Sequence, residues 1–140
     1  MKETAEGKEV ERLVKVRVNQ SIFREVVLTN FDNKCCITGI NILDLLVASH
    51  IAPWREDKKN RLSARNGLAL NMLHDKAFDK HLITVTDDLK IKISSKFYQN
   101  KDIESIKQNF IDIDGKSLIL PKKFYPDSDF LKMHNDRFVV

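Results

Sequence analysis

The stretch that decides the fold is VASHIAPWREDKKNRLSARNGLALNMLHDKAFDKHLITV, residues 47–85. Three polar residues stand out in it by their order. His50 ends an apolar run, Asn66 precedes a second apolar run, and His74 follows eight residues after Asn66. The elements that surround these three residues can be predicted from the local pattern.

The apolar run at residues 45–50 predicts a β-strand, and Pro53 ends it because proline cannot donate to a β-ladder. Asn66-Gly67 is typical of a turn. Residues 71–80 predict a helix that carries His74, and residues 82–85 with 89–93 predict a β-hairpin about a polar turn. The stretch therefore combines strands with one helix.

Upstream of this stretch, residues 2–12 are polar and predict a helix or a linker. An apolar stripe at helical spacing predicts a helix from Ile22 to Asn30, with Asn19 or Ser21 as its N-cap. Cys35 to Ile37 predict a short strand.

Downstream, residues 102–110 and 130–135 predict two helices. Residues 111–114 and 117–120 flank Gly115 and predict a second hairpin. The chain thus belongs to the α+β class.

Length and charge narrow the function classes. The chain has 140 residues, which suits one domain, and its 24 basic and 20 acidic residues give a net charge of +4, which permits an anionic partner such as DNA. It contains no apolar run long enough for a membrane span and no signal-peptide core, so we expect a cytoplasmic protein. The two cysteines, Cys35 and Cys36, are adjacent, which excludes a four-cysteine zinc site and predicts free thiols.

Four short motifs resemble the HNH (ββα-metal) endonuclease family, in particular its restriction-type domains. They are CCITG at residues 35–39, ASHIAPW at 48–54, NGLAL at 66–70 and HDKAFD at 74–79. The resemblance implies a ββα-metal finger with a core at about residues 34–80, inside a domain at 19–140 that follows a polar segment at 1–18. The local patterns described above add flanking helices and hairpins.

By position, the resemblance implies that His50 is the general base that activates water and that Asn66 braces the loop behind it. It implies that His74 is a ligand of one divalent metal ion, with magnesium expected and manganese, nickel or zinc as alternatives. An imidazole suits the base role because it accepts a proton near neutral pH. We expect His50 and His74 to face one cleft.

The second metal ligand departs from the family pattern. Ser49 stands where many members have Asp or His, and Phe78 cannot bind a metal. Asp79 is the predicted second ligand, with Ser49 or water as the alternative. His81 stands where related sequences often have Gly and is predicted to be a surface residue.

The predicted function is metal-dependent, restriction-like hydrolysis of double-stranded DNA. Lys58, Arg61 and Arg65 lie between the base and the ligand helix and are the predicted phosphate contacts. Two alternatives stay open, a non-catalytic nucleic-acid-binding module on a decayed HNH scaffold and a toxin-type nuclease. A homodimer and a larger polypeptide on the N-terminal side stay open as well.

Overall fold

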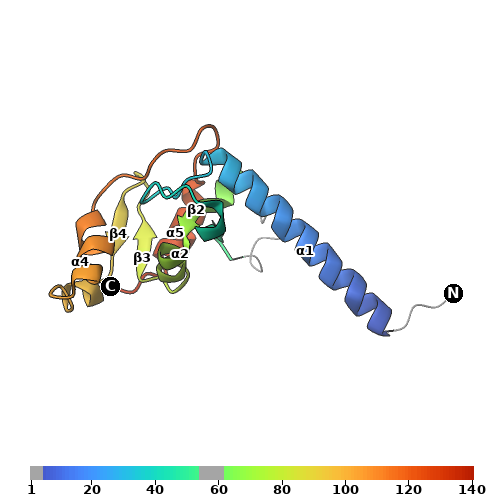
Figure 1. The fold of residues 1–140 in the computed structure, drawn as a ribbon, viewed down its shortest axis with the longest axis horizontal. Coiled ribbons are helices and arrows are strands. Elements are labelled where there is room, and N and C mark those ends of the chain that lie inside the picture. Colours follow the sequence, from blue (N-terminus) through green and yellow to red (C-terminus); the bar gives the residue numbers. More distant parts are fainter. Residues whose placement is uncertain (1–4, 54–61) are drawn as a thin grey trace.

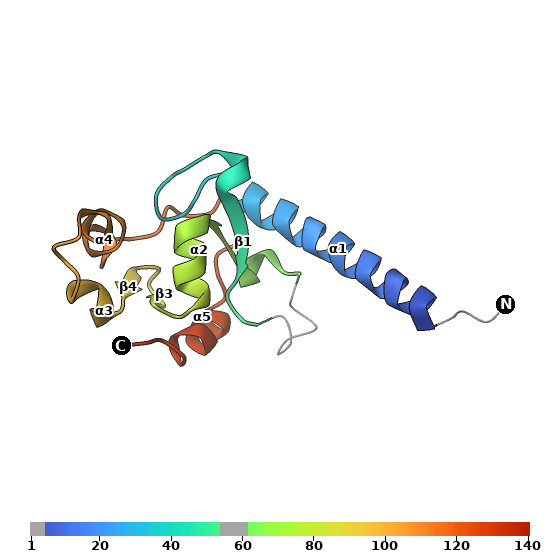
Figure 2. The same ribbon diagram turned by 60° about the horizontal axis from the view of Figure 1, so that its bottom comes forward.

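The first element is a long helix that projects from the rest of the molecule. A computed structural model describes residues 5–53 and 62–140, and helix α1 (Ala5–Asn30) extends away from the body toward the N-terminus (Figures 1 and 2). Its 26 residues span roughly 39 Å at 1.5 Å per residue. Only its C-terminal part is buried, where Phe23, Val27 and Leu28 enter the core.

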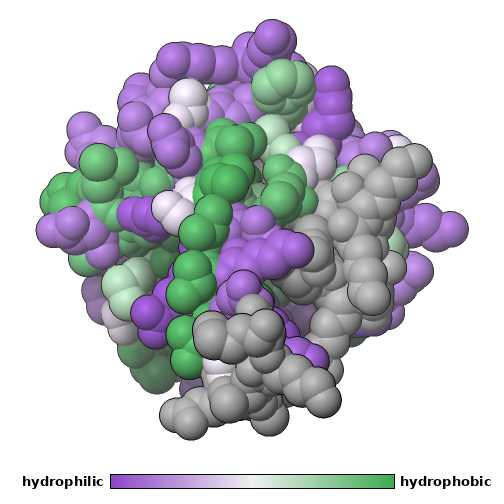
Figure 3. All heavy atoms as spheres, turned by 90° about the vertical axis from the view of Figure 1, so that its right-hand side faces the viewer, coloured by the Kyte–Doolittle hydropathy of each residue, from purple (hydrophilic) through white to green (hydrophobic). Residues whose placement is uncertain are grey.

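The prediction of a separate helix that begins near Ile22 was wrong, because α1 is continuous from Ala5. Asn19 and Ser21 lie inside the helix and do not cap it. Each lowers helix propensity by less than about 1 kcal/mol, and their neighbours include good helix formers and no proline. The projecting part carries exposed aliphatic side chains among its charges, and apolar surface is visible on this side of the molecule in Figure 3.

An antiparallel hairpin and a helix follow. Strand β1 (Leu46–His50) pairs with β2 (Gly67–Asn71), in a register that sets Leu46 opposite Asn71 and His50 opposite Gly67. Helix α2 (Met72–Asp79) begins directly after β2. Short 3₁₀ turns precede each strand, at Leu43–Leu45 and Ala64–Asn66. The predicted strand at 45–50 and helix at 71–80 are confirmed.

Gly67 is the first residue of β2, so the prediction of a turn at Asn66-Gly67 was wrong. A Cβ atom on Gly67 would lie 2.4 Å from Val27 Cγ2 and 2.9 Å from Phe23 Cζ. The glycine is therefore needed because α1 packs directly against the backbone of β2. This contact fixes α1 to the hairpin at the position opposite His50.

The C-terminal half contains a second hairpin and several short helices. Strands β3 (Ile83–Val85) and β4 (Ile91–Ile93) pair antiparallel, which confirms the predicted hairpin. The helices are α3 (Ser95–Tyr98), α4 (Glu104–Asn109), a 3₁₀ turn at Ile111–Ile113, and α5 (Ser128–Asn135). The predicted helices at 102–110 and 130–135 correspond to α4 and α5.

The predicted hairpin at 111–114 and 117–120 was wrong. Gly115, with φ of +79°, turns the chain back toward β4, so that its N–H donates to the Ile91 carbonyl at 2.8 Å. The Leu118 N–H then donates to the Leu89 carbonyl at 2.9 Å, and Ser117 forms an isolated bridge with Lys90. These residues pair with the earlier hairpin and not with each other.

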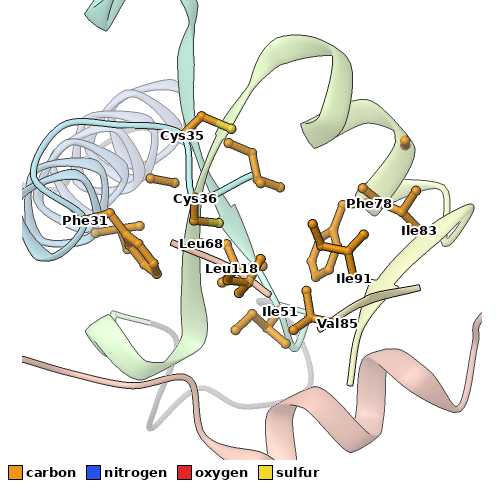
Figure 4. Packing of buried hydrophobic residues seen from close by; sticks show 14 of the residues in the cluster. Phe31, Cys35, Cys36, Ile51, Leu68, Phe78, Ile83, Val85, Ile91 and Leu118 are labelled. Atoms are coloured by element: carbon orange, nitrogen blue, oxygen red, sulfur yellow. The ribbon is translucent and has the colours of Figure 1, made fainter. Parts of the chain in front are cut away.

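The CCITG motif forms turns, so the predicted strand at Cys35 to Ile37 was also wrong. The Cys36 N–H donates to Ala69 in β2, and its carbonyl accepts from the Ile119 N–H, both at 2.8 Å. Both cysteines are free, as predicted, and both are buried. They lie within a continuous core that joins the first hairpin to the second (Figure 4).

The molecule is a mixed α and β structure, as expected from the sequence. One core contains side chains from α1, both hairpins and α5. No helix in the described part of the chain is both long and apolar enough to cross a membrane.

Candidate functional site

His50 lies at the end of β1, where two hollows in the surface meet. One is a cleft of about 450 Å³ between the end of β1 and helix α2. The other is a groove of about 490 Å³ between β1 and α1. The imidazole ring stacks on Phe23 of α1, with ring centroids 3.7 Å apart and planes 5° apart, so α1 fixes the plane of the ring.

Asn66 holds the chain immediately after His50. Its side chain is fully buried, accepts from the Ala52 N–H at 2.7 Å and donates to the Ala52 carbonyl at 3.3 Å. Its own carbonyl accepts from the Ile51 N–H at 3.0 Å. A buried amide that both donates and accepts fixes the backbone that follows His50, because an unpaired group there would be costly.

Two carboxylates of α2 face the cleft. Asp75 and Asp79 both line it, and residues four apart in a helix share one face. The Ser49 hydroxyl donates to the Asp75 carboxylate, which ties the end of β1 to α2. The residues that line the cleft therefore include one histidine of β1, one serine and two aspartates.

His74 does not reach this cleft, which corrects the expectation that it faces the same space as His50. The residue is only 1% exposed. Its Nε2–H donates to the Asn109 carbonyl at 2.7 Å, and its Nδ1 lies 2.8 Å from Asn71 Nδ2.

The N-cap of α2 decides the protonation of this ring. The Asn71 Oδ1 accepts from the N–H groups of Leu73 and His74, so the Asn71 Nδ2 must be the donor to the imidazole. The Nδ1 lone pair is therefore used, and Nε2 carries the proton. Burial lowers the pKa of His74, although the hydrogen bond to Asn109 opposes this. As placed, the ring has no lone pair left for a metal.

A third histidine closes the base of the cleft. His134 of α5 is 3% exposed, and its ring stacks on Phe78 at 3.7 Å and on His81 at 4.3 Å between centroids. Its Nε2–H donates to the Phe78 carbonyl at 2.8 Å, and its Nδ1 accepts from the Thr84 hydroxyl at 2.7 Å. Burial is the main cause that lowers its pKa to about 4, so the ring is neutral at pH 7.

One of the three predicted DNA contacts can be placed. Arg65 is exposed, its Nη1 donates to the Tyr125 carbonyl at 3.3 Å, and its guanidinium lies 5.5 Å from the centre of the Phe124 ring. Lys58 and Arg61 lie outside the described residues. The role of all three in DNA binding stays a prediction.

The donor set of the cleft suits a hard divalent cation. Mg²⁺ binds through one or two carboxylates and completes its shell with water and substrate phosphate, whereas structural zinc needs four N or S ligands. Asp75 and Asp79 supply two carboxylates with no thiolate nearby. Within residues 5–53 and 62–140, no three His, Cys, Asp or Glu side chains are close enough to hold a metal by themselves. The residues therefore fit an ion that the substrate helps to bind.

A family model described as HNH endonuclease matches residues 35–86. Residues 35–86 are an HNH-family domain. This domain begins at the buried cysteine pair and ends just after β3, so it contains β1, β2 and α2 with every cleft residue except His134. Helix α1 and the segment after residue 86 lie outside the match.

A solved structure, described as a modification-dependent TagI restriction endonuclease, is similar to the chain with a TM-score of 0.51 and 18% identity. The similarity covers 83% of this chain and 37% of that one. At 18% identity it shows a similar fold. No curated protein sequence matches the chain.

The cleft also contains residues that the sequence analysis did not select. Asp75 directly follows His74 and is rotated about 100° from it around the helix. That rotation is what brings it to the cleft once His74 is buried. The presence of Asp75 and Asp79 in the cleft could have been inferred from their spacing, because residues four apart lie on one face of a helix. His134 gave no comparable signal, since its partners Thr84 and Phe78 are 50 and 56 residues away.

Proposed function

We propose that the HNH domain is the site of metal-dependent hydrolysis of DNA phosphodiester bonds, with His50 as the general base. The observation that carries the proposal is the cleft that joins His50 to the carboxylates of Asp75 and Asp79. Phosphodiester hydrolysis needs a group that takes a proton from water and a centre that offsets the charge of the phosphate. The cleft offers residues for both tasks.

His50 is suited to the base role by its position and by its support. His50 lines the cleft, while Phe23 stacks on its ring and the Asn66 contacts hold the backbone that follows it. In the proposed step, the ring accepts a proton from water, and the hydroxide so formed attacks phosphorus as the ester oxygen leaves. Asn66 acts as a positioning residue.

Asp75 and Asp79 are the proposed metal ligands, and Ser49 orients Asp75 through its hydroxyl. A bound divalent ion supplies Lewis-acid stabilisation of charge on the phosphate oxygens. Oxygen donors favour magnesium or manganese over zinc. The competing assignment from the sequence, His74 with Asp79, requires the His74 ring to leave its bonds to Asn71 and Asn109.

The test is nicking of supercoiled plasmid by the wild-type protein and by His50→Ala, with Mg²⁺, Mn²⁺ or a chelator. We expect the wild-type protein to nick only with metal, and His50→Ala to be slower by roughly 10²- to 10⁴-fold. Raising the pH should restore part of the lost rate because hydroxide replaces the base. Metal affinity, measured by calorimetry, should be unchanged in the variant.

A His50→Ala variant that nicks at the wild-type rate would contradict the base role. Nicking that persists in excess chelator would contradict the metal requirement. Parallel assays on single-stranded DNA and RNA of the same sequence define the substrate class.

A non-catalytic nucleic-acid-binding module is the second candidate function. It is favoured by the lack of a three-ligand cluster among the described residues, and by Ser49 at the position where many family members have a ligand. A wild-type protein that binds duplex DNA in a salt-dependent manner, yet never nicks it with any metal, would establish this candidate.

A further inference from the structure

His81 occupies a backbone position that favours glycine. It follows α2 with φ of +60°, in the left-handed region that side chains with a Cβ avoid. The His81 N–H donates to the Phe78 carbonyl at 3.0 Å, and the Leu82 N–H donates to the Ala77 carbonyl at 2.9 Å. This pair of bonds is the Schellman arrangement that ends many helices, in which the residue at the position of His81 is usually glycine.

The side chain of His81 nevertheless has a defined place. Its ring stacks on His134, which is held by two hydrogen bonds and by a second stack on Phe78. The three rings form a pile that ends at the cleft, and His81 lines that cleft together with His50 and Asp79. Among the described residues, the His81 ring nitrogens have no hydrogen-bond partner.

We propose that His81 is a substrate-binding residue, whose ring N–H donates a hydrogen bond to a phosphate oxygen of the DNA strand in the cleft. Strained backbone positions that persist in a fold are concentrated at functional sites, and here the strained residue lines the cleft. The inference rests on the proposed function of the cleft.

Three substitutions separate backbone strain, ring stacking and hydrogen bonding. His81→Gly removes the strain and the ring. His81→Phe keeps the strain and the stack but has no N–H. His81→Asn removes the stack, adopts the left-handed region more readily than most residues, and keeps an N–H donor. Asn33→Gly is the matched control, because Asn33 has φ of +57° and does not line the cleft.

The measurements are Tm by calorimetry, Kd for a short duplex by fluorescence anisotropy, and KM for plasmid nicking. We expect His81→Gly to raise Tm by about 3–6 °C, because it relieves the left-handed strain. The same variant should weaken Kd and KM about 10-fold, as for loss of a hydrogen bond to a charged oxygen. His81→Phe should weaken them equally without a rise in Tm, and His81→Asn should stay within about 3-fold of the wild type. Asn33→Gly should leave Kd and KM unchanged.

A His81→Gly variant with wild-type Kd and KM would overturn the proposal, whatever its Tm. Wild-type values in His81→Phe would do the same, because stacking alone would then suffice. If the wild-type protein binds duplex without nicking it, the proposed nuclease function fails while Kd still tests the His81 contact. A wild-type protein that binds no duplex would overturn both.

Discussion

Helix α2 carries His74 on one face and Asp75 with Asp79 on another, and these faces meet different surroundings. The first packs against Asn109 and Phe110, where burial lowers the pKa of His74 and both ring nitrogens are hydrogen-bonded. The second borders the cleft that contains His50. A histidine is the residue type that a motif search favours as a metal ligand, yet here the neighbouring aspartates have the accessible position.

The contrast arises at the N-cap of α2. Asn71 caps the helix with its Oδ1, which leaves its Nδ2 free to hold the His74 ring. Asn71, which caps the helix, therefore also holds the ring of His74 in the interior. Helical rotation then turns the positions one and five residues later toward the cleft. Whether a side chain is available for chemistry depends on such local contacts more than on its type.

The largest effect is expected from removing the two carboxylates on the face of α2 that borders the cleft. We expect Asp75→Asn with Asp79→Asn to lower metal affinity and to slow nicking, each by about 10- to 100-fold or more, because loss of even supporting groups at metal sites costs about 10- to 100-fold. Calorimetric titration with Mn²⁺ and plasmid nicking measure the two effects.

The control for that experiment is His74→Gln, which retains a donor and an acceptor in the buried position. Its metal affinity should match that of the wild-type protein. If His74→Gln loses metal binding while the double aspartate variant keeps it, the two faces of α2 have the opposite roles.

The buried face predicts an effect on stability. His74→Ala should lower the free energy of unfolding by about 2–4 kcal/mol, because it leaves a cavity and strands the partner groups on Asn71 and Asn109. Asp75→Asn, on the cleft side, should change it by less than about 1 kcal/mol. Urea denaturation at pH 7 compares the two.

The pH dependence of the free energy of unfolding tests the burial of His74. The pKa of His74 is lowered in the folded state, so below about pH 6.5 the unfolded chain binds a proton that the folded chain does not. The wild-type protein should therefore lose stability as the pH falls through this range, and His74→Gln should lose less. Equal pH dependence in both proteins would show that His74 titrates as an exposed residue.

The smallest expected effect concerns Arg65 and the salt dependence of DNA binding. If Arg65 pairs with a DNA phosphate, Arg65→Ala should reduce the slope of log affinity against log salt by about one unit. Binding to a short duplex, measured across salt concentrations, tests this. Lys101→Ala is the control, since Lys101 is exposed and does not line the cleft, and its slope should equal that of the wild type.

The sequence predicted the elements that local patterns encode. Strand β1, helix α2 and the hairpin of β3 and β4 were confirmed, and His50 and Asp79 lie in one cleft. The continuous α1 was missed because Asn19 and Ser21 resemble a cap when only local pattern is considered. Gly67 looked like a turn because its close contact with Val27 lies 40 residues back in the chain.

The site was predicted less completely than the fold, for a related reason. The position of His74 depends on Asn109, which lies 35 residues away in sequence. The pile of Phe78, His134 and His81 depends on a helix near the C-terminus. Contacts of this kind follow from tertiary packing, which a pattern of residue types does not report.

The bonds between Asn66 and Ala52 have a consequence for how the protein can change. These bonds join a residue shortly after β1 to the residue just before β2, at the two ends of the connection between the strands. The two ends are therefore held together by bonds that involve none of the residues between them. The entropy of loop closure grows slowly, by about 0.6 kcal/mol for each doubling of length. Substitution or insertion between Pro53 and Leu62 is therefore expected to leave the register of the strands and the place of His50 intact. Under the proposed nuclease function, this connection can therefore be altered without displacing the proposed base.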